Sequence, residues 1–323
     1  MTQTPSSESA ALLCFIDDVR RGLGTDGPRS LPSKYLYDEV GSALFEVICV
    51  LPEYGLTRAD RRLLLRHTRD WIAALPPRCA VVELGSGSSK KTRIILEALV
   101  QRGPTTYMPI DISAAALQGC ARELGDIRGL DIHGLHAEYL PGLQAASARR
   151  HDEGPLLVLF LGSTIGNFDR QAGEDFLASV RQQLRPGDLL FLSADMVKSE
   201  PQLVAAYDDS IGVTAAFNKN VLARINRELA GQFSLQDFAH VARWNPKERR
   251  IEMHLQALRD LTVRIERADL DVAMRRGETI KTEDSYKFSY DDLLAMTQRA
   301  GFRISGHWHD DEWSFSQSLL LAS

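Results

Sequence analysis

The chain has 323 residues, a length that suits one large α/β domain or a core domain with a second, smaller one. Hydrophobic residues make up 44% and charged residues 25%, a balance that excludes a disordered, collagen-like or coiled-coil protein. The formal charge of −5 lacks the basic footprint of most nucleic-acid binders, so we expect no nucleic-acid partner.

The sequence carries no sign of a membrane segment or of an exported protein. Its longest apolar runs, Ala10–Ile16 and Leu156–Leu161, are far shorter than the roughly 20 residues of a transmembrane helix. No Lys or Arg precedes the first run, which argues against a signal peptide. The cysteines are widely spaced and form no C-x-x-C pair: Cys14, Cys49, Cys79 and Cys120. We therefore expect reduced thiols in a cytoplasmic monomer, with no membrane contact.

The N-terminal third reads as helices separated by breakers. The first nine residues are polar and are expected to be frayed, and a helix is predicted over Ala10–Arg21. Glycine and proline interrupt it over Gly22–Pro32. A second helix is predicted over Asp60–Leu75, ending at Pro76-Pro77.

From Cys79 to Asp195 strands and helices alternate. Four short runs rich in β-branched or apolar residues predict strands: Cys79–Leu84, Thr105–Ile110, Leu156–Leu161 and Leu189–Ser193. Helical spacing predicts helices over Lys91–Leu99 and Glu174–Leu184. This alternation is typical of a doubly wound parallel sheet.

After Asp195 the alternation stops and later resumes. Between these points we predict a helical stretch, an antiparallel strand pair and a helix: Pro201–Leu229, Arg249–Leu258 with Leu261–Arg267, and Leu270–Arg276. A helix then follows, capped by Gly301, and the chain ends with two strands of the main sheet: Ser289–Ala300, Phe302–Trp308 and Ser314–Leu321. Residues 196–286 are therefore predicted to be an insertion.

A glycine turn, Gly85-Ser86-Gly87, follows the first strand and precedes a helix, where a nucleotide-like ligand meets backbone amides. Asp111, at the end of the second strand, can accept hydrogen bonds from both hydroxyls of a ribose. The dinucleotide fingerprint needs a third glycine where Lys90 stands, and the ATPase phosphate loop needs glycine before Lys91-Thr92. The remaining ligand is S-adenosylmethionine, and the alternative is a tight turn without function.

Seven separated blocks resemble the histidine-specific Nα-methyltransferases of ergothioneine biosynthesis. In chain order they are LPSKYLYDEVGSALFE (31–46), LPEYGLTRAD (51–60), ELGSGSSKKT (83–92), FLGSTIGNF (160–168), AYDDSIGVTAAFNKN (206–220), IEMHL (251–255) and TEDSYKF (282–288). The resemblance implies three methyl transfers to the α-nitrogen of free histidine, which give trimethylhistidine (hercynine), the first step of that pathway.

The resemblance also implies a fold: an α/β, Rossmann-like class I methyltransferase sheet with an inserted α+β substrate-binding domain. The S-adenosylmethionine-binding domain would comprise 59–195 and 287–323, and the substrate-binding domain 1–58 and 196–286.

The matched positions imply two sets of ligand-binding residues. Those expected to bind S-adenosylmethionine, or its product S-adenosylhomocysteine, are Tyr37, Gly85, Lys91, Asp111, Glu138 and Tyr139. Those expected to bind histidine are Tyr54, Gly162, Asn167, Tyr207, Met253, Glu283 and Ser285. Within the second set, Asn167 and Tyr207 suit the α-carboxylate, whereas Glu283 and Ser285 suit the two imidazole nitrogens.

Two departures from the family pattern keep an alternative open. The family usually has a second tyrosine where this chain has Gly55, and an apolar residue where it has Asp284. Both adjoin the expected imidazole contacts, so a methyltransferase of another small amino acid or amine is the first alternative. A nicotinamide-dependent dehydrogenase and a sensor of S-adenosylmethionine are two more. The eight histidines supply no converging ligand set, so we expect no metal.

Overall fold

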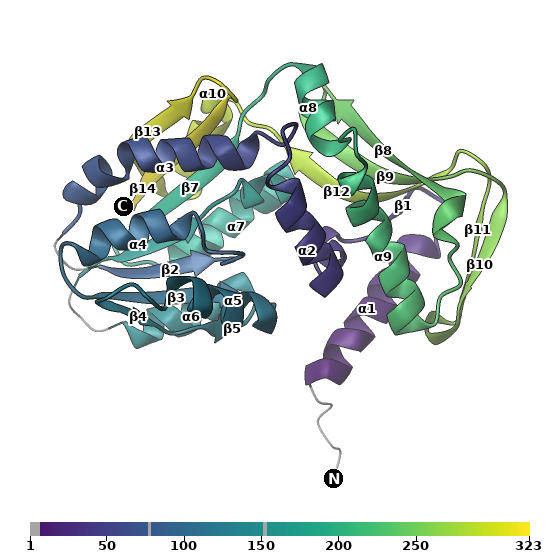
Figure 1. Ribbon diagram of the computed structural model, residues 1–323, viewed down its shortest axis with the longest axis horizontal. Coiled ribbons are helices and arrows are strands. Elements are labelled where there is room, and N and C mark those ends of the chain that lie inside the picture. Colours follow the sequence, from purple (N-terminus) through teal and green to yellow (C-terminus); the bar gives the residue numbers. More distant parts are fainter. Residues whose placement is uncertain (1–6, 77–78, 151–153) are drawn as a thin grey trace, which may run out of the picture. The chain divides into compact units, whose positions relative to one another are not determined.

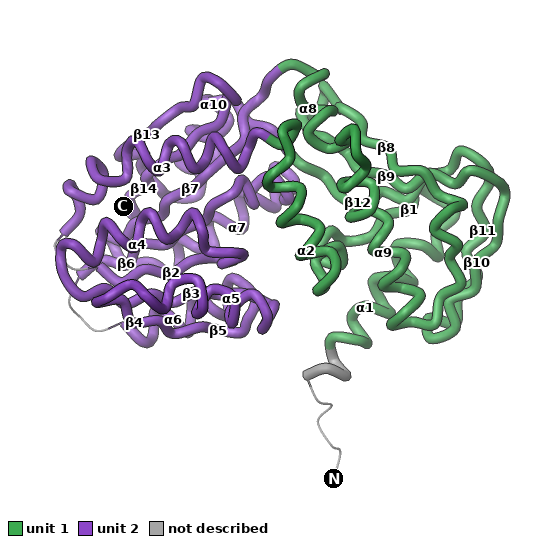
Figure 2. Tube along the Cα trace, viewed as in Figure 1, with its two compact units in different colours: residues 1–54, 199–285 green, residues 55–198, 286–323 purple. Residues whose placement is uncertain are grey.

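The computed structural model describes residues 7–76, 79–150 and 154–323, so residues 1–6 of the expected frayed end and Pro77 lie outside it. The chain forms two compact units (Figure 2). The sheet unit comprises Gly55–Lys198 and Tyr286–Ser323, and the insertion unit comprises the chain through Tyr54 and Ser199–Ser285. The chain passes from one unit to the other at 54/55, 198/199 and 285/286, whereas the expected boundaries were 58/59, 195/196 and 286/287.

The sheet unit is built on an eight-stranded sheet (Figure 1). Its strands are β2 (Ala80–Leu84), β3 (Thr105–Asp111), β4 (Leu130–Ile132), β5 (Leu135–His136), β6 (Leu156–Phe160), β7 (Leu189–Asp195), β13 (Phe302–Asp310) and β14 (Phe315–Ala322). The order is β13-β14-β7-β6-β2-β3-β4, with β5 beside β3. Only β14 runs antiparallel to its neighbours, β7 and β13. The predicted Rossmann-like class I sheet, including its last two strands, is confirmed.

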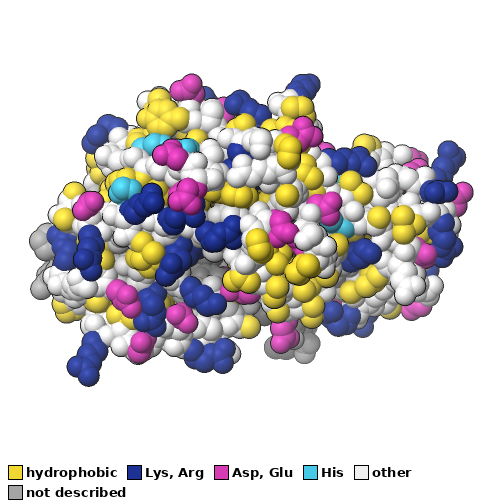
Figure 3. Space-filling view, turned by 45° about the horizontal axis from the view of Figure 1, so that its top comes forward, with side chains coloured by type: hydrophobic (Ala, Val, Ile, Leu, Met, Phe, Trp, Pro, Cys, Tyr) yellow, Lys and Arg dark blue, Asp and Glu magenta, His cyan; other side chains and the backbone are white. Residues whose placement is uncertain are grey.

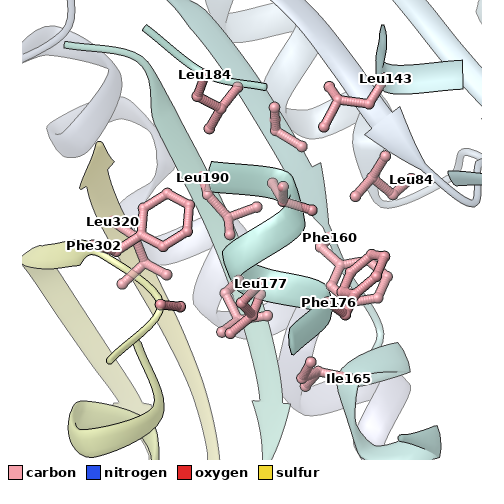
Figure 4. Close-up of a cluster of buried hydrophobic side chains, with 14 of the residues drawn as sticks. Leu84, Leu143, Phe160, Ile165, Phe176, Leu177, Leu184, Leu190, Phe302 and Leu320 are labelled. Carbon is pink, nitrogen blue, oxygen red and sulfur yellow. The ribbon is translucent and has the colours of Figure 1, made fainter. Parts of the chain in front are cut away.

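Helices cover both faces of this sheet because successive residues of a strand point to opposite sides. One face packs against α3 (Leu56–Ala73), α4 (Thr92–Val100) and α5 (Ala114–Leu124). The other packs against α6 (Tyr139–Arg149), α7 (Arg170–Gln182) and α10 (Tyr290–Arg299). Phe160 of β6, for example, meets Phe176 of α7 in the second core, where Leu190 of β7 also packs (Figure 4).

The described part of the insertion unit holds a four-stranded sheet, a hairpin and four α-helices. The sheet has the order β1 (Arg29–Ser30), β12 (Thr279–Tyr286), β9 (Arg250–Ala257) and β8 (Phe238–Asn245). The hairpin pairs β10 (Leu261–Ile265) with β11 (Leu270–Met274). The α-helices are α1 (Ser7–Leu23), α2 (Glu39–Ile48), α8 (Glu200–Tyr207) and α9 (Val213–Leu229), and α9 packs on β8 and β9.

Three sequence-based predictions for the insertion are wrong. Arg249–Leu258 does not pair with Leu261–Arg267, because β9 lies between β12 and β8. The stretch predicted as a helix, Leu270–Arg276, forms β11, whose residues alternate between exposed and buried from Asp271 to Met274. The residues of this stretch favour a helix, but pairing with β10 overrides that local propensity. The predicted Pro201–Leu229 helix is two helices, α8 and α9, and Gly212 begins the second with φ +79°.

The surface mixes charge of both signs. On the face drawn in Figure 3, basic and acidic side chains lie among apolar ones. Within the described ranges, every helix is too short or too polar to cross a lipid bilayer.

Candidate functional site

The loop after β2 requires glycine for its backbone. Gly85 and Gly87 have φ values of +84° and +46°, in the left-handed region. The Gly85 amide donates to the carbonyl of Ile110 (2.9 Å), which ties the loop to β3. A side chain at Gly85 would press on the Tyr139 hydroxyl, which lies 3.2 Å from an ideal Cβ. The loop therefore presents backbone rather than side chains at the carboxyl end of β2.

Asp111 lies at the carboxyl end of β3, beside this loop. Its Oδ1 accepts a hydrogen bond from the Ser113 amide (2.9 Å). Its Oδ2 lies 3.5 Å from both Ser86 Oγ and the Gly87 amide, the outer limit of hydrogen bonding. These long contacts leave Oδ2 able to accept shorter hydrogen bonds from a bound hydroxyl.

Glu83 anchors the base of the loop, and sequence analysis did not single it out. The Glu83 side chain is 2% exposed, accepts from Thr92 Oγ1 (2.7 Å) and is hydrogen-bonded to the Tyr107 hydroxyl. Burial raises the pKa of Glu83 to about 7, against the lowering effect of these two donors. The one available signal was an acidic residue inside an otherwise apolar strand.

Lys91 and Gly162 meet at a buried carboxylate, Asp60 of α3. Asp60 Oδ2 accepts from Lys91 Nζ (2.5 Å) and from the Gly162 amide (3.2 Å). Its Oδ1 accepts from Ser193 Oγ (2.9 Å) and Gln317 Nε2 (2.7 Å). Lys91 is thus held in place rather than solvated, and the Gly162 N–H is already engaged. Sequence analysis missed Asp60, whose partners are distant along the chain.

The other expected residues of the sheet unit differ in burial. Glu138 is exposed and precedes α6, whereas Tyr139 packs edge-on against Phe160 and Phe176. Burial and the nearby charge of Asp111 raise the pKa of Tyr139 to about 12, so its phenol stays protonated.

Asn167 lies on the loop that follows β6. It is the last residue of a short 3-10 helix, η2 (Thr164–Asn167), and is partly buried. A Cβ at Gly166 would lie 2.8 Å from the Tyr286 carbonyl oxygen, so this loop packs directly on the backbone at Tyr286.

Within the insertion unit, Glu283 and Ser285 of β12 are both buried, at 8% and 6% exposure. Ser285 Oγ is hydrogen-bonded to the Tyr207 hydroxyl at the end of α8 (2.7 Å). The Tyr37 hydroxyl donates to Glu283 Oε1 (3.4 Å). The structure therefore brings Tyr37, expected at the cofactor, into contact with a residue expected at the imidazole.

Aromatic rings pack around these polar groups. Tyr54 makes edge contacts with Tyr207 and with Phe45, at centroid distances of 6.0 and 6.2 Å. Tyr37 makes edge contacts with Phe45 (5.5 Å) and Phe217 (5.3 Å). Met253, 1% exposed, lies on the adjacent strand β9. The unit thus combines a carboxylate, two hydroxyls and an apolar wall, which suits a planar ring that carries hydrogen-bonding nitrogens.

Asp284 does not share the environment of its neighbours. Its carboxylate pairs with Lys281 (2.6 Å) and with Arg250 (3.3 Å). Lys281 and Asp284 are only partly buried, unlike Glu283 and Ser285. Asp284 therefore adds no uncompensated charge beside Glu283.

Gly55 is explained by its neighbour in the sheet unit. A Cβ at this position would overlap the indole of Trp313, which follows β13. The Trp313 amide donates to Asp310 (2.9 Å), and Arg62 of α3 holds that carboxylate at 2.6 and 2.8 Å. A tyrosine at position 55 would require the Trp313 ring to move.

The histidines considered for a metal remain dispersed. His133 pairs with Asp131 (2.7 Å), and His307 Nδ1 is hydrogen-bonded to Ser318 (2.9 Å). Among residues 7–76, 79–150 and 154–323, no three His, Cys, Asp or Glu side chains are grouped to hold a metal ion.

Comparison with known proteins gives consistent matches. The model of a family described as histidine-specific, S-adenosylmethionine-dependent methyltransferases matches residues 15–322. Histidine N-alpha-methyltransferase of Mycolicibacterium smegmatis is 42% identical over 94% of this chain and 94% of its own. The protein of the same name from Mycobacterium tuberculosis is 41% identical over 97% and 96%. Ergothioneine biosynthesis protein 1 of Neurospora crassa is 30% identical over 88% of this chain, which spans 32% of that longer protein.

Proposed function

Because the chain belongs to the histidine-specific, S-adenosylmethionine-dependent methyltransferases, we propose that it methylates the α-nitrogen of free L-histidine. Three successive transfers would give trimethylhistidine, the first intermediate of ergothioneine biosynthesis. The observation that carries the proposal is the pair Glu283 and Ser285, buried on one strand among aromatic rings. Few side-chain pairs are so well suited to the two nitrogens of an imidazole.

We assign cofactor binding to the sheet unit, whose residues fit S-adenosylmethionine. The cofactor supplies the methyl group on a positively charged sulfur. The left-handed backbone at Gly85 admits a ligand close to the main chain, and Asp111 Oδ2 would accept from the ribose hydroxyls. Lys91, held by Asp60, supplies a cation for the carboxylate of the cofactor. Glu138 and Tyr139 would hold the adenine.

We assign the imidazole to the insertion unit. Glu283 would accept from one ring nitrogen and Ser285 would bond the other, with Met253 packed beside the ring. Ser285 is hydrogen-bonded to the Tyr207 hydroxyl, so a change at Tyr207 would also affect the proposed contact between Ser285 and the imidazole. The contact from Tyr37 to Glu283 favours a role for Tyr37 beside the imidazole rather than at the cofactor.

Asn167 of the sheet unit and Tyr207 of the insertion unit each carry a neutral donor of the kind that suits the α-carboxylate of histidine. The space near Gly162 and Asn167 would accept the amine. The residues then act by orientation, since an aligned nucleophile gains up to roughly 7–11 kcal/mol in ideal cases. The amine must be neutral to attack, although a free α-amino group has a pKa of about 8.

Neither of the two departures that motivated the alternative substrate, another small amino acid or amine, now favours it. The negative charge expected from Asp284 is balanced by Lys281 and Arg250. Trp313 fills the space beside Gly55, so the glycine leaves no extra room there.

The proposal is tested by incubating the protein with labelled S-adenosylmethionine and a panel of free amino acids, with histidine amide as control. Free histidine and its mono- and dimethyl forms should be methylated at the α-nitrogen, and the amide should fail because it lacks the carboxylate. Mass spectrometry that places methyl on the imidazole, or equal turnover of the amide, would contradict the proposal. Preferred turnover of another amino acid would favour the alternative.

A further inference from the structure

One buried asparagine of α9 lies behind the side chains assigned to the imidazole. Asn218 is 0% exposed. Its Nδ2 donates to His240 Nδ1 (2.9 Å) and to the His254 carbonyl (3.1 Å), and its Oδ1 accepts from Thr282 Oγ1 (2.5 Å). Both amide protons and the carbonyl oxygen are therefore used, which fixes the orientation of the amide.

Each partner of Asn218 adjoins a residue of the proposed histidine site. Thr282 immediately precedes Glu283, and its hydroxyl lies 3.0 Å from the Met253 carbonyl. His254 immediately follows Met253 on β9. The hydrogen bonds of Asn218 thus end on β9 and β12 next to the proposed ligand-binding residues Met253 and Glu283.

The imidazole of His240 extends this network to α8. Since Nδ1 accepts from Asn218, the proton of the neutral ring is on Nε2, which donates to the Tyr207 carbonyl (2.7 Å). Burial lowers the pKa of His240, which favours the neutral ring. His240 therefore fixes the end of α8 that carries the Tyr207 hydroxyl.

Thr282 and Glu283 are successive buried residues of β12. Both faces of the strand are covered here, since Ser285 and Tyr286 are buried as well and Asp284 is partly buried. The Thr282 hydroxyl, held by Asn218, anchors β12 one residue before Glu283.

We infer that Asn218 and His240 are positioning residues for imidazole recognition: they hold Glu283, Met253 and Tyr207 in a receptive arrangement without contacting the substrate. This inference rests on the proposed function. Preorganisation of this kind lowers the cost of binding because the side chains need not be ordered by the ligand.

The test compares two variants of similar side-chain size, His240→Leu and His240→Gln. Leucine removes both hydrogen bonds, whereas the glutamine amide supplies a donor for Tyr207 and an acceptor for Asn218. His240→Leu should raise the Michaelis constant for histidine about tenfold, and His240→Gln should stay within about threefold of the unmodified protein. The affinity for S-adenosylhomocysteine, measured by calorimetry, should change less than about twofold in both.

Asn226→Leu is the matched control, because Asn226 lies on the same helix and also makes two hydrogen bonds, both to the Phe233 backbone (2.7 and 2.8 Å). A control variant that raises the histidine Michaelis constant as much as His240→Leu would overturn the inference, as would failure of His240→Gln to restore it. Should His240→Leu not fold, Thr282→Val removes only the hydroxyl and should raise the constant about threefold. An unchanged constant in Thr282→Val would then overturn the inference.

The two hypotheses fail in different ways. If the unmodified protein does not methylate histidine, the proposed function fails. If it does, and His240→Leu matches Asn226→Leu, only the positioning role is lost.

Discussion

The adjacent carboxylates of β12, Glu283 and Asp284, lie in different environments. Glu283 is 8% exposed and receives the Tyr37 hydroxyl. Asp284 lies between the cations Lys281 and Arg250 and is more exposed. Removing the first leaves a ligand nitrogen without a partner, whereas removing the second breaks a partly solvated ion pair, which is worth little.

Glu283→Ala should therefore raise the Michaelis constant for histidine at least about tenfold, the equivalent of about 1.4 kcal/mol. Asp284→Asn, the adjacent control, should change it less than about threefold. Steady-state kinetics with histidine as the varied substrate measures both. If Asp284 proves the sensitive position and Glu283 the indifferent one, the assignment of the imidazole contacts is wrong.

Glu83 predicts a dependence of stability on pH. Burial raises its pKa to about 7 in the folded protein, from an ordinary value of 4.5. Between these values the folded state holds a proton that the unfolded state has lost, so the free energy of unfolding falls as pH rises. The fall should reach about 3 kcal/mol, at about 1.4 kcal/mol for each unit of pKa.

Glu83→Gln cannot ionise and should lack this part of the dependence. Urea unfolding of both proteins from about pH 4.5 to 8 measures it as the difference between the two curves. Parallel curves would show that Glu83 does not titrate in this range.

At the scale of elements, α3 is tied to three neighbouring strands of the sheet unit, β7, β14 and β13. Its Asp60 contacts β7 and β14 through Ser193 and Gln317, and its Arg62 holds Asp310 at the end of β13. The helix begins beside Trp313, where Gly55 makes room for the indole. The N-terminus of α3 and the turn between β13 and β14 are therefore packed as one arrangement.

Gly55→Tyr should destabilise the protein by about 1–3 kcal/mol, because the new side chain overlaps the Trp313 ring. Trp313→Ala should also destabilise it, by leaving a cavity. In the double variant the two costs should partly cancel, giving a loss smaller than the sum of the single losses. Urea unfolding of the three variants tests this, and strict additivity would show that the two positions do not share space.

At the scale of the whole molecule, the chain is divided so that each unit has its own polar site. The backbone passes between the units three times, at 54/55, 198/199 and 285/286. The sheet unit carries Asp111 and the glycine loop, and the insertion unit carries Glu283 and Ser285. Because the proposed ribose contact lies in the sheet unit and the proposed imidazole contacts lie in the insertion unit, a variant of either set should affect one ligand at a time.

Asp111→Ala should weaken S-adenosylhomocysteine binding by about 1.5–3 kcal/mol, the scale of hydrogen bonds to a charged group. Glu283→Ala should leave that affinity nearly unchanged. Asp131→Ala is a suitable control, because Asp131 lies on the neighbouring strand β4 with its side chain 71% exposed. Calorimetry gives the three affinities, and an unchanged value for folded Asp111→Ala would remove this residue from the cofactor site.

The local sequence was sufficient for six of the eight strands of the central sheet, whereas the short strands β4 and β5 were not predicted. Leu156–Leu161 and Leu189–Ser193 are continuous apolar runs, and only a strand covered on both faces accommodates such runs at that length. The sequence also predicted the glycine loop, because glycine adopts the left-handed backbone of such a turn most easily. Asp111 was predicted from its place at the end of the second strand. Family resemblance, rather than periodicity, supplied the histidine-binding residues.

Tertiary structure decided what depends on partners remote in sequence. The pairing of β9 with β8 and β12, and of β10 with β11, could not be read from short strands whose propensities are ambiguous. The pairing that orders Lys91 is made by Asp60, whose other contacts lie 102, 133 and 257 residues away. The same is true of Asn218, which meets Thr282 across 64 residues. Such buried groups are satisfied only when the fold brings donors and acceptors together, so no local pattern records them.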